Sequence, residues 1–325
     1  MKYIYSLSEN PFELSSFEGD RDTALSAGYK EITDEEYESL VKHKLKWNNG
    51  DLVENYDNTR DDGTEIGIII GSYIFPRTKK FVDTFCEKGV KLLAVEKDDI
   101  KGRDYTNVKF IINADEEIYK YIKSQNSNIK FFNKWKAAYS CDDKWLTYVL
   151  LKDAGVPQPL TSLNSEDISY PKVIKTRFGS YGYGVHLAHD IVEETSITNN
   201  FRQGALIFQE YIESSKGKDI CAYVINNECV ACMIRENTSQ DEFRSHTIYG
   251  ATATAYNLTK AQKTQAIQIA QTLGVNFCSI NFLIDSDGTL KVCDVNSNPG
   301  VDVIESATGV NVIDTYANYI IRAIK

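Results

Sequence analysis

The strongest constraint on the fold is a hairpin pattern close to the C-terminus. Two alternating segments, 281–285 and 290–295, flank the short polar connection Ser-Asp-Gly. A turn of this kind between alternating strands predicts an antiparallel β-hairpin. Because successive side chains of a strand point to opposite faces, we expect Asp294 and Asn296 on one face and Cys293 on the other.

The polar face of this hairpin has the composition of a site for a hard cation. Asn281 on the first strand, with Asp294 and Asn296 on the second, offers amide and carboxylate oxygens. These are the ligands that Mg²⁺ takes in proteins, usually together with phosphate oxygens. The hairpin therefore predicts a metal site beside a nucleotide. A hairpin whose polar face meets only water explains the same residues equally well at this point.

Length and composition describe a soluble globular protein of two or three domains. The chain has 325 residues, of which 42% are hydrophobic and 25% charged, enough to bury a large core. Its net charge of −10 argues against non-specific binding to nucleic acids or membranes. No apolar run approaches the roughly 20 residues that span a bilayer, and no signal-peptide pattern is present. With seven scattered cysteines, these features predict a cytoplasmic protein with reduced thiols.

Residues 1–60 differ from the rest of the chain and are predicted to form a short accessory module. They contain a capping box at Thr33 that predicts a helix. The polar, turn-rich segment DNTRDDG at 57–63 predicts a linker. A block of this size buries little core by itself, so we expect it to pack on the main body or to recognise a partner.

The segment 64–138 has the pattern of a small parallel α/β domain. It begins with a continuous β-branched strand at 66–70, as expected of a strand that is buried on both faces. Predicted helices and strands then alternate along the chain, which indicates parallel pairing through helical crossovers. The GxGxxG fingerprint of dinucleotide binding is absent from this segment.

Two helices farther along the chain have ends that the sequence specifies. Asp142 is predicted to cap a helix that ends before Gly155. Thr259 and Gln262 form a capping box, and the helix that they open is predicted to end at Gly274.

A glycine-rich loop follows a strand that carries a lysine near its end. The strand 172–176 contains Lys175, and Gly179, Gly182 and Gly184 follow it. Such a loop lets backbone N–H groups approach phosphate oxygens closely. The GxxxxGK(S/T) phosphate-binding motif is absent. Taken alone, the loop is explained better by a structural glycine hairpin.

The order of these motifs resembles the ATP-grasp superfamily and, within it, the RimK-type peptide and glutamate ligases. The resemblance rests on FQEYI at 208–212, on Asp219 at the start of a hairpin, on DEFRSHTIYGA at 241–251 and on DVNSNPG at 294–300. Each motif is weak when taken individually, and their common order and spacing carry the resemblance.

The resemblance implies a mixed α/β and α+β fold. The ATP-grasp domain would occupy 139–325, with a lid subdomain at about 157–211. The segment 64–138 would be the leading small parallel α/β domain, and 1–60 matches nothing in the family.

The resemblance also implies a role for each matched residue. The nucleotide would be bound by Lys144, Lys175, Gly179, Ser180, Gly182, Gly184, Glu210, Tyr211, Ile212 and Asp219. Arg235 and Arg244 would be catalytic and would stabilise the γ-phosphate or the developing acyl phosphate. Asn281, Asp294 and Asn296 would hold Mg²⁺, with Mn²⁺ as a substitute. Solvated lysines, a capped hairpin and surface salt bridges are the structural alternatives.

The activity that the resemblance implies is ATP-dependent ligation of a carboxylate to an amine through an acyl phosphate. The partners would be a small-molecule, peptide or protein carboxylate and an amine, without nucleic acid or membrane, and a homo-oligomer is left open. One alternative is a ligase that forms macrocycles in a ribosomal precursor peptide. Another is a regulatory nucleotide-binding protein without ligase turnover.

Three positions depart from the pattern of the family. Asn281 stands where relatives normally carry aspartate, Asp294 where they usually carry glutamate, and His246 where they often carry asparagine. Asn281 can offer a carbonyl oxygen to Mg²⁺ but brings no charge. We therefore expect metal binding to depend more on the phosphates of the nucleotide. Asn281 is also the residue that favours the alternative without turnover.

Overall fold

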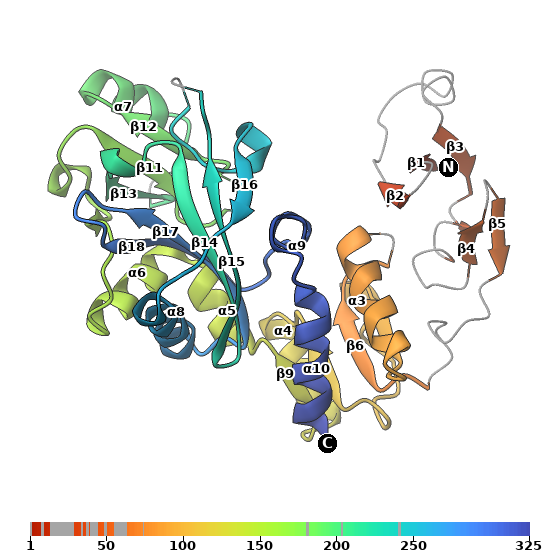
Figure 1. Cartoon of the computed structure of the whole chain (residues 1–325). Helices are drawn as coiled ribbons and strands as arrows, with labels where there is room; N and C mark the ends of the chain where they lie inside the picture. The colour runs from red at the N-terminus through yellow and green to blue at the C-terminus, as the bar shows by residue number, and fades with distance from the viewer. Residues whose placement is uncertain are drawn as a thin grey trace. The chain divides into compact units, whose positions relative to one another are not determined.

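The computed structural model describes residues 64–325 except Ile74, Ser180, Tyr181, Gln203 and 240–241, together with short strands and isolated residues before position 64. Contacts divide the chain into two compact units, Met1–Trp135 with Ile313–Lys325 and Lys136–Val312 (Figure 1). None of the described helices is long and apolar enough to cross a membrane.

The region before position 64 contains short antiparallel strands. They are β1 (Lys2–Leu7), β2 (Asn10–Glu13), β3 (Tyr29–Ile32), β4 (Leu45–Asn48) and β5 (Asp51–Glu54), and they pair as a sheet of order β2-β1-β3 and a β4-β5 hairpin. The capping box at Thr33 is present, since the Glu36 N–H donates to Thr33 Oγ1 over 3.1 Å. Most of the helix predicted after it, and the linker predicted at 57–63, lie outside the described residues.

A four-stranded parallel sheet forms the centre of the first unit. Its order is β7-β6-β8-β9, with β6 (Gly67–Ile70), β7 (Leu92–Val95), β8 (Phe110–Ile112) and β9 (Lys130–Phe132). The helices α3 (Pro76–Glu87) and α4 (Glu116–Gln125) belong to the connections between strands. The apolar strands are almost completely buried, as expected when both faces of a sheet are covered. The predicted parallel α/β fold is thus confirmed.

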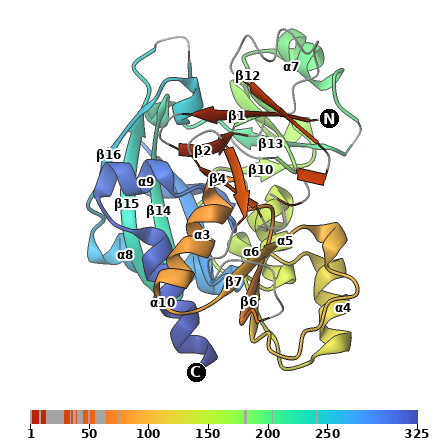
Figure 2. The same ribbon diagram turned by 90° about the vertical axis from the view of Figure 1, so that its right-hand side faces the viewer.

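The C-terminal helix is part of this first unit. In α10 (Val312–Ile324), the ring of Tyr316 packs edge-on against Phe81 of α3, with 6.1 Å between ring centroids. The two helices lie side by side in Figure 2. By its contacts α10 belongs to the first unit, and the compact second unit ends at Val312. The buried residues Ile313, Tyr316, Ala317 and Ile320 form the apolar face of this helix. The predicted bounds of the domain 139–325 stay a prediction.

The second unit contains a five-stranded antiparallel sheet of order β16-β15-β14-β17-β18. Its strands are β14 (Lys218–Ile225), β15 (Glu228–Glu236), β16 (Thr252–Ala255), β17 (Phe277–Ile284) and β18 (Leu290–Asn296). The helices α6 (Lys144–Asp153) and α8 (Lys260–Leu273) share one core with it. Ile269 of α8 and Ile280 of β17 are completely buried in this core. One face of the sheet is therefore apolar, and the other is free to carry polar groups.

A smaller antiparallel sheet forms the region predicted as the lid subdomain. Its order is β10-β13-β11-β12, with β10 (Thr161–Ser162), β11 (Lys172–Thr176), β12 (Val185–Ala188) and β13 (Leu206–Glu210). The helix α7 (Ile191–Thr198) packs on β12. Ile174 and Ala188 are completely buried in a separate small core.

The N-cap of α6 corrects a prediction. Asp143, and not Asp142, caps this helix, and its Oδ1 accepts hydrogen bonds from the N–H groups of Trp145 and Leu146 at 3.1 and 3.3 Å. Asp142 is instead the last residue of α5 (Trp135–Asp142). The sequence pattern missed α5, which ends directly before the cap and takes up the first of the two aspartates.

The ends of α8 are as predicted. The Gln262 N–H donates to Thr259 Oγ1 over 3.3 Å, and the Thr259 N–H donates to Gln262 Oε1 over 2.9 Å. Gly274 ends the helix with a φ of +72°, a conformation that glycine adopts without strain.

Thr259→Ala is expected to lower the free energy of unfolding of the second unit by about 1 kcal/mol, because it removes the acceptor of the Gln262 N–H. Urea-induced unfolding followed by circular dichroism measures this loss. Thr272→Ala is the matched control, because its hydroxyl donates to Gln268 O within the same helix and caps nothing. Equal effects of the two substitutions would contradict the capping role.

Candidate active site

One cavity of about 140 Å³ in the second unit brings together most of the predicted site residues. This first cavity is lined by Lys144, Lys175, Gly179, Gly182, Tyr211, Ile212, Asp219, Arg235, Arg244, Asn281 and Asp294, among others. They come from α6, from both sheets and from the loops between them, so only the tertiary fold assembles them. Ser180 lies outside the described residues.

Gly184 and Glu210 are not among the residues that line this cavity. Gly184 has a φ of +69°, and a Cβ at this position would lie 2.7 Å from the side chain of Thr176. It therefore shapes the loop between β11 and β12. The side chain of Glu210 accepts a hydrogen bond from the Leu160 N–H at 3.1 Å and lies 3.5 Å from Lys291 Nζ. The carboxylate of Glu210 thus supports the strand end.

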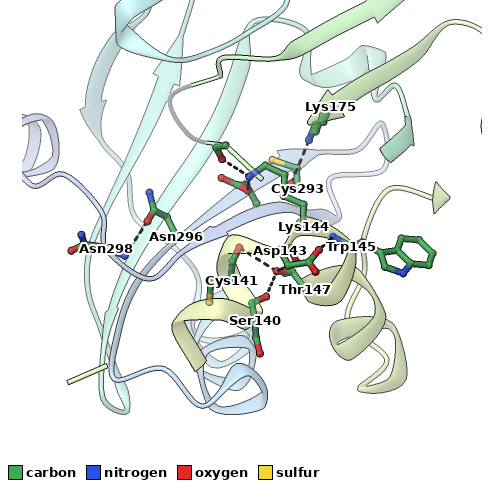
Figure 3. Close-up of polar contacts among 12 residues, drawn as sticks. Ser140, Cys141, Asp143, Lys144, Trp145, Thr147, Lys175, Cys293, Asn296 and Asn298 are labelled. Carbon is green, nitrogen blue, oxygen red and sulfur yellow. Dashed lines mark hydrogen bonds and ion pairs between the residues drawn. The ribbon is translucent and has the colours of Figure 1, made fainter. Parts of the chain in front are cut away.

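Lys144 connects three parts of the site. Its Nζ donates a hydrogen bond of 2.7 Å to Gly179 O in the glycine loop and lies 3.1 Å from Asp294 Oδ1 on β18. Figure 3 shows this side chain reaching from the first residue of α6 toward Cys293. The Lys144 side chain is only 13% exposed, so the alternative of a solvated lysine does not describe it.

Lys175 enters the same region from the lid sheet. It is 8% exposed, and its Nζ donates a hydrogen bond of 3.4 Å to Cys293 O (Figure 3). A buried ammonium whose bond to the protein is this long has capacity for a stronger acceptor. Lys144 and Lys175 are therefore both placed to bind an anion in the first cavity.

Asp219 and Arg235 form a buried ion pair, which the sequence analysis did not predict. They lie opposite each other on β14 and β15. Arg235 Nε donates to Asp219 Oδ1 over 2.9 Å, and Nη2 donates to Oδ2. Burial alone lowers the pKa of the Arg235 guanidinium, but the charge and hydrogen bonds of Asp219 raise it above its usual value. The pair is therefore fixed in its charged form within the site.

Arg244 lies nearer to solvent and is oriented by Glu242 and Tyr249. Its Nε and Nη2 donate to the Glu242 carboxylate over 2.9 and 2.7 Å. Its guanidinium lies 3.5 Å from the centre of the Tyr249 ring, a cation–π contact. The hydrogen bonds that the Glu242 carboxylate accepts raise the pKa of the Arg244 guanidinium. Both orienting residues lie within two to five positions of Arg244, but neither was predicted.

His246 lines the first cavity beside these arginines. Its Nδ1 accepts a hydrogen bond from the Ile248 N–H at 3.3 Å. Burial, followed by the charge of Arg235, lowers the pKa of this imidazole. The neutral ring therefore carries its proton on Nε2 and can act as a hydrogen-bond donor.

A β-bulge on β18 overturns the predicted orientation of Cys293. Asn281 pairs with Asp294, whereas the next residue, Phe282, pairs with Val292, so that Cys293 is the additional residue. A bulge interrupts the alternation of side chains along a strand. As a result, Cys293 and Asp294 both line the first cavity.

The predicted metal residues contain two buried oxygens without a hydrogen bond. Asn281 Oδ1 and Asp294 Oδ1 accept none, although Lys144 Nζ lies close to the latter. Asn296 Oδ1 accepts a hydrogen bond from the Asn298 N–H at 2.9 Å (Figure 3). Within the described part of the chain, no group of three or more His, Cys, Asp or Glu side chains is arranged to hold a metal. Amide and carboxylate oxygens of this kind fit Mg²⁺ that is also bound to phosphate.

A second cavity of about 360 Å³ shares part of its lining with the first. The shared residues are Lys144, Gly179, Gly182, Arg235, His246, Asn281 and Asp294. The sequence analysis missed this cavity. Tyr223 and Ser279 lie two positions from Cys221 and Asn281, so the alternation of the predicted strands could have indicated part of its lining.

Comparison with solved structures defines the class of fold. The ATP-grasp ligase PsnB in complex with a minimal precursor superposes with a TM-score of 0.60 at 13% identity, covering 81% of this chain and 100% of that one. A RimK domain ATP-grasp protein from Sphaerobacter thermophilus gives a TM-score of 0.59 at 17% identity, with coverage of 78% and 98%. The chain therefore has the ATP-grasp fold.

Comparison of sequences defines the family within that fold. Residues 141–322, more than half of the chain, match the RimK-like ATP-grasp domain, and the chain belongs to this family. A probable α-L-glutamate ligase of Legionella pneumophila is 33% identical over 195 residues, which are 56% of this chain and 64% of that protein. N-acetylaspartylglutamate synthase A of Homo sapiens is 28% identical over 221 residues, which are 64% of this chain and 56% of that protein. The chain thus spans less than two thirds of these relatives.

Asp219→Asn is expected to destabilise the second unit by about 3–5 kcal/mol, because it leaves the Arg235 cation buried without its counter-charge. The double variant Asp219→Asn/Arg235→Met removes both charges and should recover part of this loss. Urea-induced unfolding provides the measurement. Glu242→Gln, beside the more exposed Arg244, is the control and should cost clearly less. Equal losses of unfolding free energy in Asp219→Asn and in the control would contradict the expected extra cost of leaving the buried Arg235 cation unpaired.

Proposed function

We propose that this chain is an ATP- and Mg²⁺-dependent ligase that joins a carboxylate to an amine through an acyl phosphate. The observation that carries the proposal is the convergence of Lys144, Lys175 and Arg244 on one cavity that Asn281 and Asp294 also line. Membership of the RimK-like ATP-grasp family supports the same reaction. A peptide, protein or amino acid is the proposed source of the carboxylate.

The reaction has two steps. A carboxylate oxygen attacks the γ-phosphorus of ATP. The bond between this phosphorus and the oxygen that bridges it to the β-phosphate breaks. ADP departs, and the carboxylate has become an acyl phosphate. The amine nitrogen then attacks the acyl carbon, so that a C–N bond forms while the C–O bond to phosphate breaks. The amine loses a proton and inorganic phosphate leaves. Phosphoryl transfer of this kind mainly requires positioning and neutralisation of charge.

The residues of the first cavity are placed to provide this positioning and neutralisation of charge. Lys144 and Lys175 are proposed to neutralise the phosphates, and the low exposure of both side chains strengthens these contacts relative to bulk water. Arg244 would stabilise the charge of the transferred phosphoryl group. Tyr211 and Ile212 would contact the adenine base of ATP.

Four further residues are proposed to bind the ribose and the metal. Asp219 is proposed to reach the ribose while it remains paired with Arg235. Asn281 and Asp294 would hold Mg²⁺, together with Asn296. The cation would supply neutralisation of phosphate charge at this position.

The test is ADP release from ATP and Mg²⁺ in the presence of a panel of carboxylates and amines. We expect ADP release that requires a carboxylate, and trapping of the acyl phosphate as a hydroxamate when hydroxylamine replaces the amine. Lys144→Met should abolish both signals. Lys152→Met, which removes an exposed lysine of the same helix, should preserve them.

Two other outcomes have distinct meanings. ATP binding without any carboxylate-dependent ADP would reject the ligase and support a regulatory nucleotide-binding protein. A dehydrated cyclic product from a peptide that carries both groups would instead identify a macrocycle-forming ligase.

Asn281→Asp is expected to lower the Mg²⁺ concentration that gives half-maximal ADP release, because a second carboxylate adds negative charge at the cation site. A Mg²⁺ titration at fixed ATP measures the change. Asn227→Asp, at an exposed residue of the turn between β14 and β15 that lines neither cavity, is the control and should leave the titration unchanged. If Asn281→Asp loses ADP release but retains ATP binding, asparagine is itself the required ligand.

A further inference from the structure

The floor of the second cavity is set by the register of three strands. Tyr223, Ser279 and Asn296 pair with one another across β14, β17 and β18. Paired positions in an antiparallel sheet point to the same face. This row lies two residues farther along each strand than Cys221, Asn281 and Asp294. The cavity therefore continues from the row of Asn281 and Asp294 into a compartment that Tyr223 and Ser279 line.

The charges of the second cavity are divided unequally. Lys144 and Arg235 belong to the part that it shares with the first cavity, where the phosphates would bind. Among the described residues that line only the second cavity, the charged ones are Asp142 and Asp302, and both are acidic. An anionic ligand in the part of the cavity beside these two residues would be repelled by their carboxylates, whereas a cationic ligand would be attracted by them.

The side chain of Asp142 lines the second cavity, is exposed to solvent and makes no hydrogen bond and no ion pair within the described part of the chain. A bound cation would therefore meet a carboxylate that no other residue of the described chain engages.

The compartment has apolar wall segments beside polar ones such as Ser279 and Thr247. Tyr223 and Met233 line it from the five-stranded sheet. Ile248 lines it from a short 3-10 helix (Thr247–Tyr249), and Val303 lines it from the start of α9 (Asp302–Thr308). Ile248 is 50% exposed and Val303 38%, so both keep apolar surface available. Such walls suit a chain of methylene groups.

We propose that the second cavity binds an aliphatic primary amine in its ammonium form, with Asp142 and Asp302 balancing the charge. The methylene chain of the amine lies along the apolar walls. The inference rests on the proposed function, in which this amine is the acceptor of the acyl group. The ligand chemistry is that of a lysine side chain or of a free alkyl diamine, and it excludes a dianionic acceptor such as glutamate.

The test is ligand-observed NMR titration of the full chain, with and without Mg²⁺ and a non-hydrolysable ATP analogue. The probes are Nα-acetyl-L-lysine N-methylamide, 1,5-diaminopentane and L-glutamate. We expect saturable binding of at least one amine and binding of glutamate that is at least tenfold weaker. Preference for the lysine derivative identifies a peptide as the source, and preference for the diamine identifies a free amine.

Asp142→Asn/Asp302→Asn is expected to weaken amine binding at least tenfold while affinity for the ATP analogue is retained. The control Asp153→Asn/Glu166→Gln changes the net charge equally at exposed residues outside both cavities and should leave amine binding unchanged. If the double variant does not fold, Asp142→Asn and Asp302→Asn are tested singly, and each should weaken binding severalfold.

Three results would overturn the inference: absence of saturable amine binding, binding of glutamate as tight as that of the amines, or undiminished amine binding in the Asp142 and Asp302 variants. Failure of the proposed function looks different. It would leave amine binding intact and abolish carboxylate-dependent ADP release.

Discussion

The antiparallel pairing of β14, β17 and β18 is the constraint on which the candidate site depends. Backbone hydrogen bonds hold Cys221, Asn281 and Asp294 in one row, although they are far apart in the sequence. The other face of the same strands enters the core with α8, where Ile280 is completely buried. A slip of one residue would exchange the two faces, so the apolar core fixes the register of the polar site.

The local charge of the site differs from that of the whole protein. The chain has a net charge of −10, yet its first cavity contains Lys144, Lys175, Arg235 and Arg244. Arg235 is held by a buried carboxylate, and Arg244 by a more exposed one. These partners keep the guanidinium groups in place before any anion binds, so that little reorganisation is needed when phosphates enter. Overall acidity therefore does not argue against a phosphate site.

The proposed metal site combines a departure from the family pattern with a geometry that still fits a cation. Asn281 brings no charge to this site, but its Oδ1 and that of Asp294 are buried oxygens that accept no hydrogen bond, with Lys144 Nζ 3.1 Å from the latter. The bulge at Cys293 brings Asp294 into register with Asn281. The substitution thus changes the charge of the site more than its architecture, and a cation there would depend strongly on the nucleotide.

The sequence alone determined the features that local interactions control. The capping box at Thr259, the alternating pattern of strands and helices, and the glycine loop depend mainly on neighbours within a few residues. The order of the motifs also identified the family and half of the residues that line the first cavity. Only the tertiary structure decided the Asp219–Arg235 pair, the bulge at Cys293 and the second cavity. These depend on which strands pair and in which register, and that choice is made by a core whose members are distant in the chain.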